Sequence, residues 1–426
     1  MRANKIERLH FGFVLTPSAD GRLLAIPKGA LGVDKEGCLA FVGSRADLEP
    51  DDKEAIIQDH GSGILFPGFV DLHVHLPQIG SRGRSRSDLL QWLHKDIYPA
   101  EAKFADPEYA GQCARRFVKE CARNGVTTTV AFLTSHKEAS KRSISVIAES
   151  GIRSVVGAVQ MDRNGPQELL NNVEDSISCA EELAGKWHGY DSGRVKYALI
   201  PRFAISCSDR LLKELGRLKT QAPSLYVHTH LSEQKGEIDE VSRLFPQADD
   251  YLSVYEDAGL VGELTLFAHC IHLSDRELSS LISQGAGVAH CPSSNLFLKS
   301  GIFPWQRSVD ADLRFGLGSD VGAGPEMSPF RVMRDAYFMQ LNQVIPPDEL
   351  LWRATLGAAQ ALGMEDEIGS LEVGKEADFV VLDLKGRPEM EDQDHSSIEG
   401  ICSSLVFLGD DRVVRESWVR GKRLER

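Results

Sequence analysis

Short apolar runs alternate with longer amphipathic stretches between residues 64 and 356. The runs are mostly apolar, which is typical of parallel strands buried on both faces. Eight runs are found, at 64–70, 126–133, 154–160, 195–200, 225–229, 264–268, 287–289 and 313–317. Helical stretches between them include 109–124, 169–186 and 274–283. Eight strand–helix units predict an α/β fold of the (β/α)8 TIM-like barrel type, with functional side chains at the C-terminal ends of the strands.

The two chain ends have a different pattern. Short strand-like pieces at 39–42, 379–382, 404–407 and 417–419 are separated by turn residues, glycine above all. We expect residues 1–66 and 370–426 to pair into one small β-sandwich domain. Residues 67–369 would then form the (β/α)8 barrel, with any functional site at the C-terminal ends of its strands.

Composition and charge narrow the class of protein. A hydrophobic fraction of 42% with 26% charged residues describes a soluble globular protein. The formal charge of -14 argues against nucleic acid or an acidic membrane as partner and favours a small neutral or cationic ligand. The eight cysteines are scattered without a CxxC pair, so they indicate neither a disulfide framework nor a thiolate zinc site. With no signal-like segment and no membrane-length apolar run, the sequence predicts a cytoplasmic location.

The strongest chemical signal is the histidine pair of the segment PGFVDLHVH, His73 and His75. Residues two apart on a strand face the same way, so both imidazoles point into the barrel at its catalytic end. Such a pair suits a metal such as zinc, and two hydrogen-bonded core histidines are the alternative. Later strand ends carry further histidines and acidic residues, namely His230, Glu233, His269, His290 and Asp320. Their spread over separate strands favours the metal site.

Three imidazoles and one carboxylate leave one metal position open for water, whose pKa bound zinc lowers to about 7. Hydrolysis also needs a group that moves a proton, and Glu233, three residues beyond His230, suits this role. His228 is interpreted as a core residue or a partner of the ligands, with His230 as the ligand. His290 either orients substrate or neighbours, or caps its strand. The zinc signature of nucleobase deaminases, HxE followed by PCxxC, is not completed here, because the chain contains no PCxxC.

These residues resemble the amidohydrolase superfamily. The resemblance implies a metal bound by His73, His75, His230 and Asp320, a proton shuttle at Glu233, and an activating His269. Asp320 would also support catalysis. The fourth run is followed by Pro201-Arg202-Phe203 and not by a lysine that could be carbamylated. In this respect the chain resembles the branch of the superfamily that binds one metal ion. One zinc ion per chain is implied, and Fe²⁺ accepts the same ligands.

Within the superfamily the chain is most similar to the guanine deaminase family, through segments 73–78, 88–93, 98–101, 161–164, 201–204, 291–298 and 319–322. The resemblance assigns Gln78, Trp92, Arg202 and Phe203 to binding of the base. Arginine donors match the O6 and N7 acceptors of guanine, and an aromatic ring stacks on any base. The side-chain amide of Gln78 both donates and accepts hydrogen bonds, which suits a purine edge with mixed groups. A structural salt bridge is the alternative for Arg202.

The resemblance thus implies hydrolysis of the 2-amino group of guanine by a metal-activated hydroxide, giving xanthine and ammonia. A cytoplasmic homodimer acting in purine catabolism is expected. The alternatives are another aminated heterocycle (a pterin, an aminotriazine or an adenine-type ring), a cyclic amide, and a scaffold without catalysis. Two features differ from the family pattern, the basic loop 79–87 and Lys299. The loop is either a solvated segment or a lid over the site.

Overall fold

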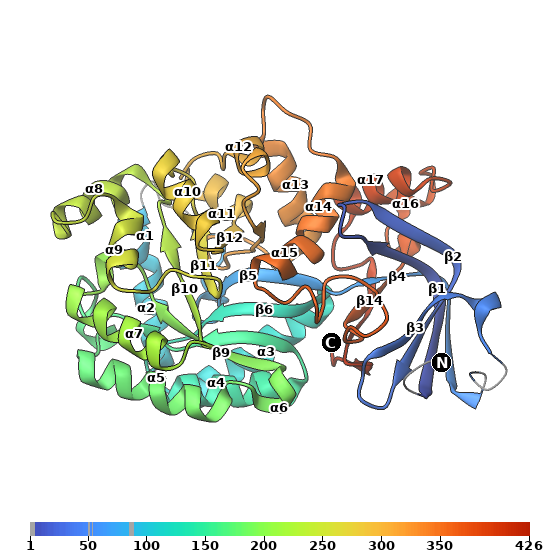
Figure 1. The fold of residues 1–426 in the computed structure, drawn as a ribbon, viewed down its shortest axis with the longest axis horizontal. Coiled ribbons are helices and arrows are strands. Elements are labelled where there is room, and N and C mark those ends of the chain that lie inside the picture. The colour runs from blue at the N-terminus through green and yellow to red at the C-terminus, as the bar shows by residue number, and fades with distance from the viewer. Residues whose placement is uncertain (1–4, 50–51, 53, 85–88) are drawn as a thin grey trace.

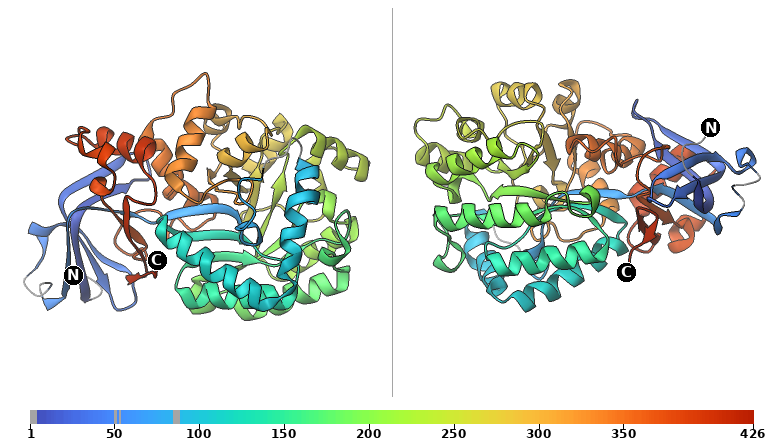
Figure 2. Two further views of the ribbon diagram at one scale, coloured as in Figure 1. Left: turned by 180° about the vertical axis from the view of Figure 1, so that it is seen from behind. Right: turned by 60° about the horizontal axis from the view of Figure 1, so that its bottom comes forward.

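The computed structural model describes residues 5–49, 52, 54–84 and 89–426. Two sheets organise the chain, a parallel barrel and a second sheet built from both chain ends (Figure 1). The N-terminal strands and the C-terminal elements lie together on one side of the barrel in every view (Figures 1 and 2). The predicted fold class is confirmed.

The barrel strands follow one another in chain order, apart from the two-residue strand Val159–Gln160, which lies off this path and pairs with the strand that follows it. They are β5 (Phe69–His75), β6 (Val126–Phe132), β7 (Arg153–Gly157), β8 (Val159–Gln160), β9 (Val195–Pro201), β10 (Tyr226–Leu231), β11 (Thr265–His269), β12 (Gly287–His290) and β13 (Phe315–Leu317). Backbone hydrogen bonds join the first strand to the segment after the last. The Asp320 N–H donates to the His73 carbonyl at 2.8 Å, and the His75 N–H donates to the Val321 carbonyl at 2.8 Å. The ends of β5 and β13 are therefore side by side.

Helices cover the outside of the barrel (Figure 2). The α-helices up to β13 are α1 (Leu89–Trp92), α2 (Tyr98–Ala102), α3 (Pro107–Arg123), α4 (Lys137–Ser150), α5 (Val173–Trp187), α6 (Tyr190–Gly193), α7 (Asp209–Gln221), α8 (Lys235–Leu244), α9 (Tyr251–Asp257), α10 (Asp275–Ser283), α11 (Pro292–Phe297) and α12 (Trp305–Asp310). The later ones are α13 (Pro329–Met339), α14 (Pro347–Arg353), α15 (Leu356–Ala361), α16 (Pro388–Glu391) and α17 (Ile398–Leu408). Side-chain caps fix several starts, such as Asn172 before α5 and Ser274 before α10.

The second sheet has the order β16-β15-β14-β4-β1-β2-β3. Its strands are β1 (Ile6–Pro17), β2 (Leu23–Asp34), β3 (Leu39–Ser44), β4 (Ile56–Pro67), β14 (Phe379–Leu382), β15 (Val414–Val419) and β16 (Lys422–Arg423). Leu39 of β3 and Trp418 of β15 come from opposite sides of this order but belong to one buried apolar cluster. Cys38 also forms a β-bridge with Glu376, just before β14. The sheet therefore folds over on itself around this cluster.

The run at 64–70, predicted as the first barrel strand, is divided between the two sheets. Residues up to Pro67 belong to β4 of the terminal sheet, and the barrel strand begins at Phe69. Gly68 lies between them, where a Cβ would come within 1.9 Å of the Thr127 hydroxyl oxygen. An uninterrupted apolar run carries no signal for such a break, because both strands are buried.

The strand predicted at 404–407 is wrong, since these residues are helical and lie in α17. Ser397 caps the helix by accepting a hydrogen bond from the Gly400 N–H. The helix packs on α13 and α14 of the barrel, where Phe407 meets the Tyr337 ring edge-on at 4.8 Å between ring centres. A short apolar segment is compatible with either a buried strand or a buried helix. Here the packing against α13 and α14 favours the helix.

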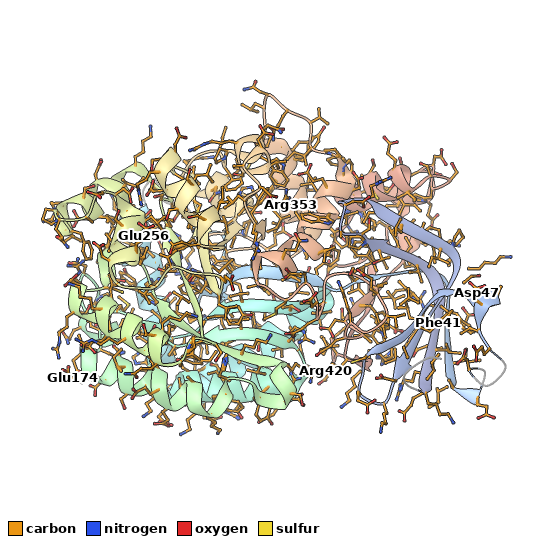
Figure 3. The ribbon with its side chains drawn as sticks, viewed as in Figure 1. Phe41, Asp47, Glu174, Glu256, Arg353 and Arg420 are labelled. Atoms are coloured by element: carbon orange, nitrogen blue, oxygen red, sulfur yellow. The ribbon has the colours of Figure 1, made fainter. Side chains whose placement is uncertain are left out.

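A buried arginine connects the two sheets. Arg153, at the start of β7, donates from Nε to Asp378 at 2.8 Å, and its guanidinium also pairs with Glu376 and, at 3.5 Å, with Glu367. Arg420 also donates to Glu376, from Nε at 2.6 Å, at the junction of barrel and terminal sheet (Figure 3). The junction is thus a charged network around one buried guanidinium.

Among the described residues, none of the helices combines the length and apolar character needed to cross a bilayer.

Candidate active site

The C-terminal ends of the barrel strands bring the four predicted metal ligands and the predicted catalytic residue His269 together. His73 and His75 come from β5, His230 from β10 and His269 from β11, and Asp320 follows β13. Nε2 of His75 lies 3.3 Å from Nε2 of His230, and Oδ1 of Asp320 lies 3.3 Å from Nε2 of His73 and 3.4 Å from Nε2 of His75. His269 is farther out, with its Nε2 3.7 Å from Oδ2 of Asp320.

These separations fit one metal ion. Two ligand atoms at about 2.0–2.1 Å from a tetrahedral zinc ion are about 3.3–3.4 Å apart, which matches the three shortest distances. Within the described residues, Nε2 of His73 and Nε2 of His269 are buried without a hydrogen-bond partner. Buried polar atoms are normally satisfied, so these two nitrogens point to a missing partner in the cluster. The donor set therefore fits a bound metal.

Hydrogen bonds fix which nitrogen of each histidine faces the cluster. Nδ1 of His228 lies 2.8 Å from the Leu266 carbonyl, which can only accept, so Nδ1 carries the proton. Nε2 of His228 must then accept, and at 2.8 Å its donor is Nδ1 of His73. The remaining nitrogen of His73 has its lone pair free for a metal, as is usual when a partner orients a ligand. His228 thus holds His73, one of the two roles predicted for it.

His230 is oriented in the same way. Its Nδ1 lies 2.5 Å from the Arg202 carbonyl and donates to it, which leaves the lone pair of Nε2 facing His75. Burial lowers the pKa of His73, and lowers the pKa of His75 and of His230 further still. All three imidazoles are therefore neutral at pH 7, the form that binds metals.

His269 has a different electrostatic environment. Burial disfavours its charged form, but the carboxylates of Glu233 and Asp320 outweigh burial, so its pKa is raised. Its Nδ1 lies 3.0 Å from Oδ1 of Asn295, and its Nε2 lies 3.6 Å from Oε2 of Glu233. His269 therefore suits a proton-donating or anion-stabilising role next to the cluster.

Glu233 lies at the lip of β10, buried beside His269. The Ser300 hydroxyl donates to its Oε1 at 2.7 Å, and Glu237 accepts hydrogen bonds from the backbone N–H groups of residues 233 and 234. Burial raises the pKa of Glu233 to about 7, and the nearby Glu237 adds to this effect. A carboxyl with this pKa gains and releases a proton easily at neutral pH, as a proton shuttle requires.

The backbone at the strand ends is held in left-handed conformations. The φ angles of Ser232, His269 and Asp320 are 51°, 72° and 45°, values that non-glycine residues adopt at a free-energy cost. Buried Asp71 supports the last of these turns by accepting the Ser319 N–H at 2.9 Å and the Ser319 hydroxyl at 2.6 Å. Residues in such conformations cluster at functional sites.

A second polar group lies in the same pocket. Arg202 and Gln78 are both buried and both bind the buried carboxylate of Glu101. The salt bridge that the sequence offered as the alternative for Arg202 is present, and Arg202 also lines the pocket. Both sequence interpretations of this residue are therefore compatible.

The pocket joins the metal-type cluster to this polar group. Its lining residues are His75, Gln78, Leu89, Trp92, Leu93, Arg202, Phe203, His230, Glu233, Glu237, His269, Leu298 and Asp320. Every predicted substrate-binding residue is among them. Trp92 is fixed by donating from its indole to the Arg84 carbonyl at 2.8 Å, at the start of a π-helical turn (Leu93–Ile97) that leads to α2.

Some singled-out residues lie elsewhere. His290 is buried away from the pocket lining and stacks on Phe303 at 4.4 Å between ring centres. Lys299 is exposed. In the basic loop, Arg82 pairs with Glu120 at 2.9 Å, and residues 85–87 lie outside the described residues. A lid role for this loop stays a prediction.

Sequence reasoning missed four supporting residues. Glu101 lies in a segment noted only for its family resemblance, and Ser300 lies beyond such a segment. Glu237 comes four residues after Glu233, and Asp71 two residues before His73. Asp71 and Glu237 could have been found from the sequence, because acidic residues close to a metal-binding motif commonly hydrogen-bond to its backbone or to its ligands. Ser300 had none, since its contact with Glu233 depends on the loop after α11.

We expect His228→Ala to weaken zinc affinity by about 10- to 100-fold, because His73 loses the acceptor that orients it. Competition against a chromophoric chelator measures the affinity. His290→Ala is the matched control, since it also removes a buried imidazole from a barrel strand end but touches no candidate ligand. Equal affinities for the His228 variant and wild type would show that His73 needs no such partner.

The fold and this site define a barrel hydrolase of the metal-dependent type, and the comparisons with known proteins agree. The amidohydrolase family model matches residues 64–424. Guanine deaminase of Escherichia coli (strain K12) is 37% identical over 86% of this chain and 84% of its own length. The chain belongs to the amidohydrolase family and, within it, to the guanine deaminase family.

Solved structures give the same relationship. E. coli guanine deaminase superposes with a TM-score of 0.94 at 33% identity, covering 98% of this chain and 99% of that one. Guanine deaminase from C. acetobutylicum, solved with guanine bound in its active site, has a TM-score of 0.91 at 30% identity and covers 98% and 99%. The amidohydrolase family is generally metal-dependent, in line with the donor set described above.

Proposed function

We propose that this protein is a guanine deaminase that hydrolyses guanine to xanthine and ammonia. The observation that carries the proposal is the single pocket in which a metal-type cluster, a proton-exchanging carboxyl and two buried hydrogen-bond donors face one ligand. A purine base with acceptors on one edge and an amino group on the other matches this arrangement. The relatives named above are guanine deaminases, and one holds guanine in its active site.

The proposed cofactor is one zinc ion per chain, held by His73, His75, His230 and Asp320. Zinc accepts three neutral imidazoles and a carboxylate, and Fe²⁺ accepts the same set. When bound, zinc supplies a hydroxide at neutral pH by lowering the pKa of water.

The proposed proton path runs through Glu233. Its carboxylate takes a proton from the attacking water and delivers it to N3 of guanine as C2 becomes tetrahedral. His269, with its raised pKa, stabilises the negative charge on the oxygen that adds to C2. Asp320 accepts a hydrogen bond from the nucleophile. A second proton, from the oxygen added at C2, then passes to the 2-amino group, which leaves as ammonia; C2 becomes the carbonyl of xanthine and N3 keeps the first proton.

The base itself is proposed to lie between Phe203 and the donors Arg202 and Gln78. Arg202 donates to O6 and N7, while the Phe203 ring, buried in the pocket, stacks on the purine. Trp92 closes the pocket from the side of α1. Excluding water in this way strengthens each polar contact with the base.

Two wider features complete the proposal. The protein is expected to act in the cytoplasm in purine catabolism, and its eight cysteines, all free thiols, suit a reducing compartment. A homodimer is the proposed assembly, and light scattering of the purified protein tests it.

The decisive experiment is ammonia release from guanine by the zinc-loaded protein, with xanthine followed by ultraviolet absorbance. Equal amounts of xanthine and ammonia are expected. Absence of both products, with about one metal per chain bound, would reject guanine and direct the search to pterins and aminotriazines. Absence of metal binding would reject the mechanism.

We expect Arg202→Ala to raise KM for guanine by about 10- to 100-fold, since a hydrogen bond from a charged donor is lost. The same change leaves Glu101 buried without its cation, so the free energy of unfolding should fall by about 3–5 kcal/mol. Steady-state kinetics at a temperature where the variant is fully folded separates the two effects. An unchanged KM would mean that the base binds elsewhere.

A further inference from the structure

A buried carboxylate organises the polar end of the pocket. Oε2 of Glu101 lies 2.5 Å from Nη1 of Arg202, and its Oε1 lies 3.1 Å from Nη2 of Arg202 and 2.8 Å from Nε2 of Gln78. The exposed fractions of Glu101, Arg202 and Gln78 are only 5%, 3% and 1%. Glu101 is absent from the pocket lining, whereas both of its partners line the pocket. It therefore acts on a ligand only through them.

These contacts fix the direction of the Gln78 amide. Nε2 donates to Glu101, and Oε1 accepts the Gly322 backbone N–H at 3.1 Å. A flipped amide would turn its oxygen toward the carboxylate and its NH2 toward the Gly322 N–H, two repulsive contacts in a buried place. An amide taken alone offers a donor and an acceptor equally, so Glu101 removes this ambiguity.

Glu101 also fixes the orientation of the Arg202 guanidinium. Its two Nη atoms bind the two carboxylate oxygens in the paired geometry that sets the plane of the group, and it lies over the Tyr98 ring at 5.1 Å. The pair has no net charge, so this end of the pocket suits a neutral ligand. The N–H groups that Glu101 does not use are the ones left for a ligand, and arginine has no acceptor.

We propose that Glu101 is a positioning residue that sets substrate specificity at purine C6. By holding Arg202 and Gln78 as donors, it makes this end of the pocket accept a C6 oxo group and reject a C6 amino group, whose N–H bonds would face other N–H bonds. Binding sites that use buried hydrogen bonds reject such analogues strongly, because the polar groups of the site are then left without hydrogen-bond partners. The inference rests on the proposed function and adds a residue to it.

The test compares guanine with 2,6-diaminopurine, which keeps the reacting 2-amino group and replaces O6 with an amino group. Ammonia release gives kcat/KM for both substrates, first with the wild type and then with Glu101→Gln. Either orientation of the new amide turns a donor toward Arg202, so the guanidinium loses its fixed position. We expect the ratio of kcat/KM for guanine to that for 2,6-diaminopurine to fall by about 10- to 100-fold, mainly through KM for guanine.

The ratio separates this role from general damage, which would lower both rates together. Glu376→Gln is the matched control, because it also removes a carboxylate from an arginine pair but at the junction of the sheets. Its ratio should equal that of the wild type. An unchanged ratio in Glu101→Gln would overturn the proposal. A wild type that forms no xanthine would instead overturn the proposed function, and this inference with it.

A double-mutant cycle keeps the proposal testable if Glu101→Gln folds poorly. Arg202→Met with Glu101→Gln replaces the buried ion pair by neutral side chains of similar size, a change that folded proteins commonly tolerate. Because Glu101 acts through Arg202 and Gln78, Glu101→Gln should change the ratio less in the Arg202→Met background than in the wild type, and what remains should come from Gln78. Fully additive effects would contradict the positioning role.

Discussion

Replacing Glu233 with glutamine is expected to lower kcat for guanine by about 10²- to 10⁴-fold while the metal content stays at the wild-type level. The amide keeps the shape of the side chain and can still accept from the Ser300 hydroxyl, but it cannot carry a proton from water to N3. Because Glu233 is not among the residues whose atoms form the metal-type groups, zinc binding should not change. Steady-state kinetics and metal analysis of the same sample measure both quantities.

The matched control for this variant is Glu240→Gln. Glu240 lies on the following helix, α8, in an exposed pair with Arg243, and an exposed pair contributes little to stability. Its kcat should stay within about twofold of the wild type. Near-normal turnover in Glu233→Gln would remove Glu233 from the mechanism, and loss of zinc would make it a structural residue of the metal site.

Replacing Arg153 with methionine is expected to reduce the free energy of unfolding by about 3–5 kcal/mol. The side chain is buried, and removing its charge leaves Asp378 and Glu376 at the junction without their shared cation. Buried Asp378 then loses its ion pair, while the partly buried Glu376 keeps Arg420, so desolvation of Asp378 and repulsion between the two carboxylates destabilise the fold. Urea unfolding followed by circular dichroism gives the free energy.

Arg210→Met provides the comparison for that measurement. Arg210 pairs with Glu174 on the outer surface of the barrel, where both side chains are largely exposed (Figure 3). Its loss should cost less than about 1 kcal/mol. Equal small effects for the two variants would show that the Arg153 network does not hold the sheets together.

The sequence predicted the barrel well because its strands are buried on both faces and stand out as apolar runs. The predicted strand 379–382 has the same bounds as β14, and the helix predicted at 274–283 begins one residue later in the structure. The predictions were wrong where burial alone does not distinguish a helix from a strand or one continuous strand from two. The break at Gly68 and the helix α17 both lie within apolar segments, whose conformation is set by partners distant in the sequence.

For the site, the sequence placed residue types at strand ends but could not supply their partners. The cluster of His73, His75, His230 and Asp320 follows from barrel geometry. The role of His228 depends on a cross-barrel distance, and the dependence of Arg202 on Glu101 joins a strand end to α2. Such pairings appear only once the chain is folded, because no local spacing encodes them.

The closure of the barrel between β5 and the segment after β13 has a consequence for biogenesis. His73 and His75 leave the ribosome early, whereas Asp320, whose backbone completes the ring beside them, is made much later. The metal site therefore cannot be complete on a nascent chain that lacks its last barrel strand. A metal ion held by the proposed ligands would stabilise the closed ring by mass action, so we expect its capture to secure the final step of barrel assembly.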